Sequence, residues 1–189
     1  MRGRSRVLAL AGALLGTAAL SAKGTRADEA WHTGPSIGPR AAFYRFSDAE
    51  RGVWGRGAQA RLRIGPAAAL EGSVDWVHYA SQGSSVYAAP LQMTLLGFLT
   101  PGAPQSFFLL IGGGWYPARS DESWVSTHRR FGPHAGAGFD LMFSRRFSVS
   151  GSYRFLWTQV NRLSDPLHLL GRQFRQRGSM FTIGLDYHL

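Results

Sequence analysis

The last ten residues of the chain, MFTIGLDYHL (180–189), alternate between apolar side chains and polar or small ones. The apolar face carries Phe181, Ile183, Leu185, Tyr187 and Leu189. Successive side chains of a β-strand point to opposite faces, so this period of two predicts a strand with one apolar face. The stretch therefore predicts an amphipathic strand, and similar segments recur upstream.

The rest of the chain repeats this pattern in segments of roughly ten residues separated by turn-forming residues. Gly and Pro are frequent, and almost no window carries the i, i+3, i+4 apolar stripe of an amphipathic helix. Eight strands are predicted, over residues 36–46, 55–65, 67–80, 86–99, 105–117, 131–144, 146–160 and 176–189. We expect Pro90 and Pro133 near strand ends or at bulges, where a missing N–H is tolerated. The fold class is all-β.

Short and long connections alternate along these strands. Residues 65–66, 100–104 and 144–145 form short turns, whereas the other four connections are longer or more polar. This alternation places all long loops at one end, and an even strand number places both termini at the other. Transmembrane barrels show this asymmetry, so we expect an eight-stranded antiparallel up-and-down transmembrane β-barrel over residues 36–189.

The first 27 residues have the pattern of a secretory signal peptide. A basic start (residues 1–6) precedes 16 apolar or small residues (7–22), and Ala27 offers a cleavage point before Asp28. The apolar stretch is short for a membrane-spanning helix, which needs about 20 residues. We therefore expect residues 1–27 to be removed on export, and residues 28–35 to form a short periplasmic segment before the barrel.

Composition excludes several classes of protein. The absence of Cys excludes a disulfide scaffold and a Cys-ligated metal site. The net charge of +10 suggests nucleic acid, but residues 1–27 hold five of the 21 Lys and Arg and no acid. The remaining chain has 16 basic against 11 acidic residues, with neither a basic helix nor a stacking platform. We expect no nucleic-acid partner.

Alternation alone does not say which face points inward, because soluble lipocalin-like carriers also have eight strands. Three features favour a membrane barrel. The opposite face mixes Gly and Ser with charges of both signs, which suits a narrow filled lumen. The final strand stays amphipathic up to Leu189. The aromatic face carries Tyr and Trp near strand ends, as interfacial girdles do: Trp76, Trp115, Tyr116, Trp157 and Tyr187.

Three stretches resemble the OmpA/OmpX-type family of small, porin-like, eight-stranded outer-membrane β-barrels. FLLIGGGWY (108–116) resembles that family's glycine-rich strand, and FGPHAGAGFD (131–140) resembles the strand after its third long loop. MFTIGLDYHL (180–189) resembles the C-terminal insertion signal read by the outer-membrane barrel assembly machinery, although Leu189 replaces the usual aromatic end. The resemblance implies a monomer in the outer membrane of a Gram-negative bacterium, contacting lipid and lipopolysaccharide. It implies no activity.

Charged residues on the inward face form the first candidate site. We predict a lumen ion-pair network of Arg61, Arg63, Glu71, Asp75, Asp140 and Arg154. Such a network is either a narrow polar pore with a gate or a structural plug. Unpaired buried charge is costly and eight-stranded interiors are filled, so the plug is favoured.

Arginines in the predicted long loops and their rims form the second candidate site. All 16 basic residues after residue 27 are Arg, whose forked guanidinium suits phosphate. The outer leaflet that this end would face carries lipopolysaccharide phosphates. We predict that lipopolysaccharide is contacted by Arg119, Arg129, Arg130, Arg172, Arg175 and Arg177. An ordinary solvated rim is the alternative.

Two other functions remain open. Some barrels of this size are lipid A acyl hydrolases or transferases, and Ser126, His128 and Glu122 could supply such chemistry. Their place in a predicted loop argues against the rigid arrangement that a nucleophile and base need. A soluble periplasmic carrier is the other alternative. The expected role is structural or surface-interacting (membrane integrity, adhesion or lipopolysaccharide contact), with no catalytic residues, cofactor or metal.

Overall fold

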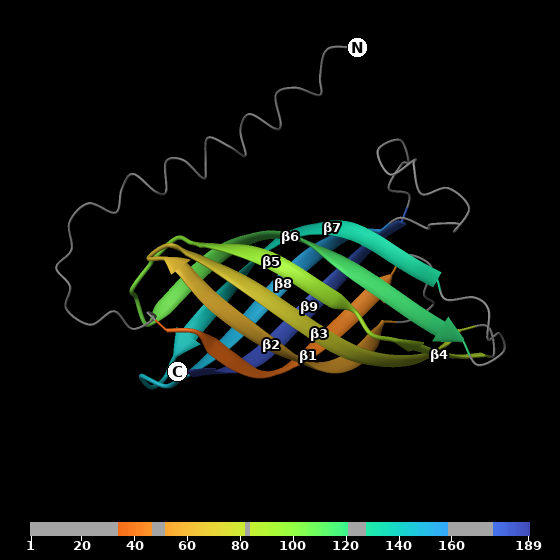
Figure 1. The fold of residues 1–189 in the computed structure, drawn as a ribbon, viewed down its shortest axis with the longest axis horizontal. Coiled ribbons are helices and arrows are strands. Elements are labelled where there is room, and N and C mark those ends of the chain that lie inside the picture. The colour runs from red at the N-terminus through yellow and green to blue at the C-terminus, as the bar shows by residue number, and fades with distance from the viewer. Residues whose placement is uncertain (1–33, 47–51, 82–83, 121–127, 159–175) are drawn as a thin grey trace, which may run out of the picture.

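The computed structural model describes residues 34–46, 52–81, 84–120, 128–158 and 176–189. These residues form one closed antiparallel barrel (Figure 1). Its strands are β1 (Ser36–Phe46), β2 (Val53–Gly65), β3 (Ala68–Ser81), β4 (Ser84–Ala88), β5 (Leu91–Phe98), β6 (Gln105–Ser120), β7 (His128–Met142), β8 (Phe147–Thr158) and β9 (Gln176–His188). No helix among the described residues is long and apolar enough to cross a membrane.

The barrel closes because every strand pairs with a neighbour on both sides. Consecutive strands pair with each other except at β4 and β5, and β1 pairs with β9 to complete the ring. Both β4 and β5 lie between β3 and β6, so the nine segments fill eight positions in the wall. The prediction of an eight-stranded antiparallel barrel is confirmed.

The fourth wall position is interrupted, which corrects the continuous strand predicted over residues 86–99. β4 and β5 are separated by Ala89 and Pro90. Pairing continues across the break, since the Asp75 amide donates to the Pro90 carbonyl (2.9 Å) and the Ala89 amide donates to the Pro117 carbonyl (3.1 Å). Pro90 thus lies between strands as expected. Pro133 lies inside β7, immediately before the ladder with β8 begins at His134.

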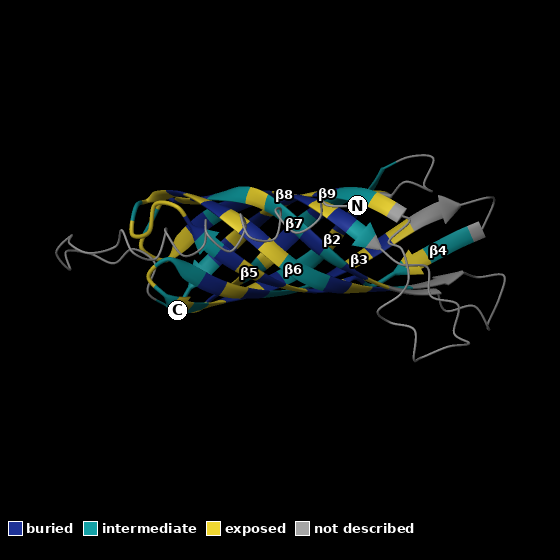
Figure 2. Ribbon diagram, turned by 90° about the horizontal axis from the view of Figure 1, so that it is seen from above, coloured by how far each residue is buried: buried dark blue, intermediate teal, exposed yellow. Residues whose placement is uncertain are grey.

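The two faces of the wall differ sharply in chemistry. Twenty-five large apolar side chains of the described residues are exposed on the outside, among them Met93, Ile111 and Ile183. Side chains at the alternate positions are buried in the lumen, and many are polar or charged. The checkerboard of buried and exposed positions in Figure 2 follows this alternation. The predicted inversion, with apolar residues outward, is what the structure shows.

One of the aromatic residues predicted for the outer face lies inside instead. Tyr116 was expected on the outer face beside Trp115, but neighbouring residues of a strand point to opposite sides. Trp115 is exposed, whereas Tyr116 is only 3% exposed, and its hydroxyl oxygen accepts a hydrogen bond from the Gln92 side-chain amide in the lumen (3.2 Å). A Tyr is accommodated inside because its hydroxyl finds a polar partner.

The ends of the barrel are defined by the short turns. The connections after β2, β5 and β7 lie at the same end as Leu189, which we call the turn end (Figure 1). In the turn after β5, Gly102 has φ = 81°, a left-handed conformation that favours Gly. The strands β1, β3, β6 and β8 end at the opposite end of the barrel, which we call the loop end.

Candidate functional site

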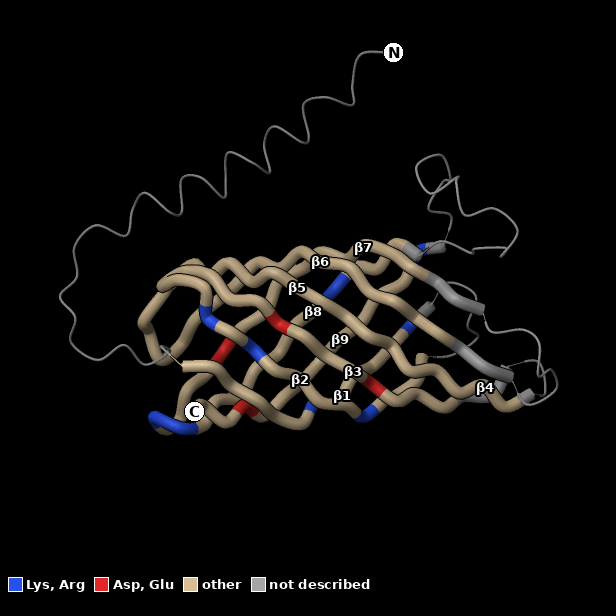
Figure 3. Tube along the Cα trace, in the orientation of Figure 1, with Lys and Arg blue, Asp and Glu red and all other residues tan. Residues whose placement is uncertain are grey.

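The lumen is filled in layers. An apolar cluster on β3, β5 and β6 lies toward the turn end: Ala69, Leu96, Phe98, Phe108 and Leu110. A second apolar cluster lies toward the loop end: Ala42, Tyr44, Val77, Tyr116, Leu156 and Met180. Charged and polar side chains occupy the space between them, where Figure 3 shows positive and negative positions interleaved along the barrel.

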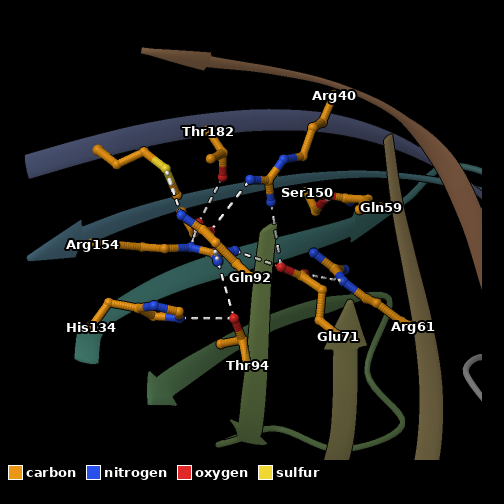
Figure 4. A network of polar contacts seen from close by, with 12 residues as sticks. Arg40, Gln59, Arg61, Glu71, Gln92, Thr94, His134, Ser150, Arg154 and Thr182 are labelled. Carbon is orange, nitrogen blue, oxygen red and sulfur yellow. Dashed lines mark hydrogen bonds and ion pairs between the residues drawn. The ribbon is translucent and has the colours of Figure 1, made fainter. Parts of the chain in front are cut away.

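Glu71 on β3 is the centre of the polar layer (Figure 4). Its Oε1 accepts a hydrogen bond from Nη2 of Arg154 on β8 (2.6 Å), and its Oε2 accepts one from Nε of Arg61 on β2 (2.8 Å). The Nη1 atom of Arg40 on β1 lies 3.7 Å from the same carboxylate. All four side chains are at least 92% buried. One carboxylate therefore joins arginines from three different strands.

Arg61 extends the network toward β7 and β9. Its Nη1 lies 3.4 Å from Oδ2 of Asp140 and 3.4 Å from Oδ2 of Asp186. Asp186 also accepts hydrogen bonds from the Gln59 amide (2.9 Å) and the Ser150 hydroxyl (2.8 Å). These contacts link β2 to β7 and β9, and β8 to β9, inside the lumen.

Arg40 forms a second pair with Asp75. Its Nε and Nη2 donate to the two carboxylate oxygens of Asp75 (2.7 and 2.5 Å), the forked geometry in which guanidinium and carboxylate match best. The Tyr44 hydroxyl also donates to Asp75, which links the pair to the apolar cluster at the loop end.

Neutral side chains satisfy the remaining donors of Arg154. Its Nη1 donates to the Gln92 carbonyl oxygen (2.9 Å) and to the Thr94 hydroxyl (3.1 Å), and its Nε donates to Ser152 (3.1 Å). Thr94 in turn contacts Nε2 of His134 on β7 (2.9 Å). Arg154 thus lies in a fully polar setting while remaining 1% exposed.

The charges that face the lumen balance among the described residues. Four arginines point inward (Arg40, Arg61, Arg63 and Arg154), as do four carboxylates (Glu71, Asp75, Asp140 and Asp186). Burial of an unpaired ion is costly, and every one of these eight groups except Arg63 takes part in an ion pair. The charged side chains of the described lumen therefore have no net formal charge that would favour cations over anions or the reverse.

Five of the six residues predicted for the lumen network lie in these ion pairs: Arg61, Glu71, Asp75, Asp140 and Arg154. Arg63 is not brought into an ion pair by the described residues. Its guanidinium lies 3.8 Å from the centre of the Phe98 ring instead, in cation–π contact at the turn end. The role of the six residues stays a prediction.

Two charged members of the network were not in the predicted set, namely Arg40 and Asp186. Alternation indicates that both occupy lumen positions. Arg40 is on the same face of its strand as the buried Ser36, and Asp186 points to the side opposite that of its chain neighbour Tyr187. The pattern in β1 is weak, since Tyr44 is buried on the same face as Arg40. The pairing of Arg40 with Asp75 depends on barrel closure and is not visible in any one segment.

The predicted rim arginines divide into three groups. Arg177 is exposed on the outer face of β9. Three more lie at the loop end of β6 and β7, namely Arg119, Arg129 and Arg130. Arg172 and Arg175 are outside the described residues, as are Ser126 and Glu122 of the catalytic alternative. No three His, Cys, Asp or Glu side chains of the described ranges are grouped as a metal site.

The C-terminal strand presents its predicted face to the outside. Phe181, Ile183 and Leu185 are 40–45% exposed, and Leu189 is 74% exposed. The backbone of β9 is paired with β8 on one side and β1 on the other. The strand therefore closes the ring, and its part in assembly remains a prediction.

These features define a class: closed eight-stranded antiparallel barrels with an apolar exterior and a packed, charge-balanced lumen. The sequence matches no protein-family model and no curated protein. Among solved structures, the fold is similar to Neisserial surface protein A (TM-score 0.63, 11% identity, 82% of this chain and 97% of the other). It is also similar to the outer membrane protein OprG of Pseudomonas aeruginosa (0.58, 13%, 86% and 99%). A third similar structure is Ail, the attachment invasion locus protein of Yersinia pestis, solved with the heparin analogue sucrose octasulfate (0.57, 15%, 84% and 100%).

Proposed function

We propose that the chain is a sealed outer-membrane barrel of a Gram-negative bacterium with a structural and surface-interacting role. The observation that carries this proposal is the inverted wall, with large apolar side chains outside and charges inside. In water, such an exterior would be a patch far larger than soluble monomers expose. In a bilayer it is the apolar band that a transmembrane barrel requires. The fold likeness to outer-membrane proteins supports the same location.

Strand length agrees with this location. A tilted transmembrane strand needs about 9–11 residues. The strands β1, β2, β3, β6, β7, β8 and β9 have 11 to 16 residues each, and β4 and β5 together fill the remaining position. We further propose that residues 1–27 are the cleaved export signal, and that the outward face of β9 is what the barrel assembly machinery recognises.

Filling of the lumen supports a plug rather than a pore. The polar layer is held by ion pairs such as that between Arg154 and Glu71 (2.6 Å), and apolar clusters lie on both sides of it. Eight-stranded barrels have interiors just wide enough for side chains. A continuous water path would require several of these contacts to break together, so at most a narrow leak is expected.

The loop end is the part proposed to meet partners. Its arginines would face the phosphates of lipopolysaccharide. The structure of Ail, which has a similar fold, contains the heparin analogue sucrose octasulfate, an anionic molecule. We propose a non-enzymatic role in membrane integrity, adhesion or lipopolysaccharide contact for this end. A lipid A-modifying enzyme is the second candidate only because Ser126, His128 and Glu122 occur near one another in sequence.

The proposal is tested by expressing the full chain in a Gram-negative host and separating the membranes. Unboiled and boiled samples are then run side by side on a denaturing gel. We expect the protein in the outer-membrane fraction, with a mobility that changes on boiling because the closed barrel resists detergent. A soluble periplasmic protein without that change would refute the proposal and favour a soluble carrier.

A further inference from the structure

One part of the outer surface combines positive charge with exposed aromatic rings, on β8, β9 and β1 near the loop end. Ser179 lies at its centre, directly across from Arg45 of β1 on one side and Phe155 of β8 on the other. Arg177 is two residues away on β9 and lies directly across from Trp157. All five belong to outward-facing positions, and we call them the Ser179 patch.

We propose that the Ser179 patch binds the phosphorylated headgroup of an acylated glycolipid, of the kind that forms the outer leaflet. The inference rests on the proposed function, because it requires the outer wall to face lipid. Its occupant is a single lipid molecule with phosphates at the head and acyl chains below. The patch supplies a partner for each of these parts.

The two arginines supply the charge. Arg45 and Arg177 are diagonal neighbours across the β1–β9 ladder, an arrangement that separates backbone positions by about 7–8 Å. That separation lets both guanidinium forks reach one phosphate or two phosphates of one headgroup. Ser179 lies between them and, being small, leaves space for the headgroup to approach the wall.

No carboxylate of the described residues competes for these arginines. All four described acids, Glu71, Asp75, Asp140 and Asp186, are buried in the lumen. The outward side of the wall near Ser179 therefore carries positive charge that its own strands do not neutralise. An anionic ligand would neutralise this charge.

The rings supply the apolar half. Phe155 is 52% exposed and contacts Trp157 and Tyr153, with ring centroids 6.5 and 5.0 Å apart. Phe181, two residues below Ser179 on β9, continues this surface toward the turn end. Acyl chains lying along these rings would extend from the headgroup into the apolar band.

Arg56 shows why the patch is distinct from other outward arginines. It is exposed on β2 and lies directly across from Trp76, but no second outward arginine lies next to it on β1 or β3. Its direct neighbour on β1 is Ala41. A single arginine can attract any anionic lipid, whereas two guanidinium groups on either side of a small residue can bind a phosphorylated headgroup specifically.

The test measures binding of fluorescently labelled diphosphoryl lipid A to the full chain, folded in zwitterionic micelles. The double variant R45Q/R177Q is expected to weaken binding about tenfold or more, because each charge-assisted contact is stronger than a neutral one. The variant S179W keeps both arginines but covers the space between them, and we expect a loss of similar size. The matched control R56Q/R146Q removes the same charge elsewhere and should stay within about twofold, as expected for exposed charges in general.

Monophosphoryl lipid A distinguishes the headgroup from the acyl chains, and it should bind the wild type more weakly than the diphosphoryl form. Inorganic phosphate at equal concentration should not displace the lipid, since it offers no apolar part. Equal losses in R45Q/R177Q and R56Q/R146Q would overturn the proposal and leave only non-specific attraction. A chain that is soluble and unchanged by boiling would instead overturn the proposed membrane location, so the two failures are distinguishable.

Discussion

Glu71 is the position at which one substitution should disturb the lumen most. In E71A, Arg154 would lose the only ion pair that the described residues give it, at 2.6 Å. Arg61 would keep Asp140 and Asp186 at 3.4 Å. Removing one partner of a buried ion pair typically costs 3–5 kcal/mol, so we expect a loss of about 4 kcal/mol in unfolding free energy.

Arg154 provides the second corner of a double-mutant cycle. We expect R154A alone to cost about 3–5 kcal/mol for the same reason. The double variant E71A/R154A removes one charge of each sign, so the lumen stays balanced. Its cost should therefore fall short of the sum of the two single costs by about 2 kcal/mol or more.

The measurement is urea unfolding of the chain folded into phosphatidylcholine vesicles, followed by tryptophan fluorescence. R63A is the matched control, because Arg63 also points inward but contacts the Phe98 ring rather than a carboxylate. It should cost only about 1 kcal/mol. Costs in the double variant that simply add, or an E71A variant as stable as R63A, would refute the idea that paired charge holds the lumen together.

Three further predictions concern packing, the outer wall and conduction. A Cβ atom at Gly138 would lie 2.5 Å from Cζ of Phe108, so G138L should cost about 1–3 kcal/mol in vesicle unfolding, whereas G72A, which faces open space, should be neutral. Ile183 is outward and 45% exposed, so I183R should cost about 2–4 kcal/mol while I183V changes little; equal stabilities would contradict a lipid-facing position. In planar bilayers, the wild type should show no steady ion conductance, and well-defined open channels would contradict the plug.

Much of the fold could be predicted from the sequence because the alternation of apolar and polar side chains within one segment is enough to indicate a strand. The alternation of Phe181, Ile183 and Leu185 is local, and it gave a strand that the structure confirms. The break at Pro90 was missed because the flanking residues alternate on both sides of it, and hydrogen bonding continues past it. The prediction for Tyr116 was wrong because its aromatic ring suggested the outer face, whereas its hydroxyl oxygen accepts a hydrogen bond from Gln92 in the lumen.

The lumen network could be predicted only in part. Inward positions follow from alternation, which is why Arg61, Glu71 and Arg154 were found. Partners follow from closure of the ring, and closure brings together residues far apart in sequence. Arg40 and Asp75 are 35 positions apart, and no local pattern connects them. A charged residue in a strand thus predicts a buried partner, but the sequence does not say which one.

The apolar outer side of the wall is expected to face lipid. The chain has no native Cys, so a single nitroxide label can be attached through L95C on the outward side of β5, with R146C in the turn after β7 as the aqueous control. Electron paramagnetic resonance in vesicles then compares access by oxygen, which concentrates in lipid, with access by a water-soluble nickel complex. We predict high oxygen and low nickel access at 95, and the reverse at 146. High nickel access at 95 would show that this side of the wall faces water, contrary to a lipid-facing exterior.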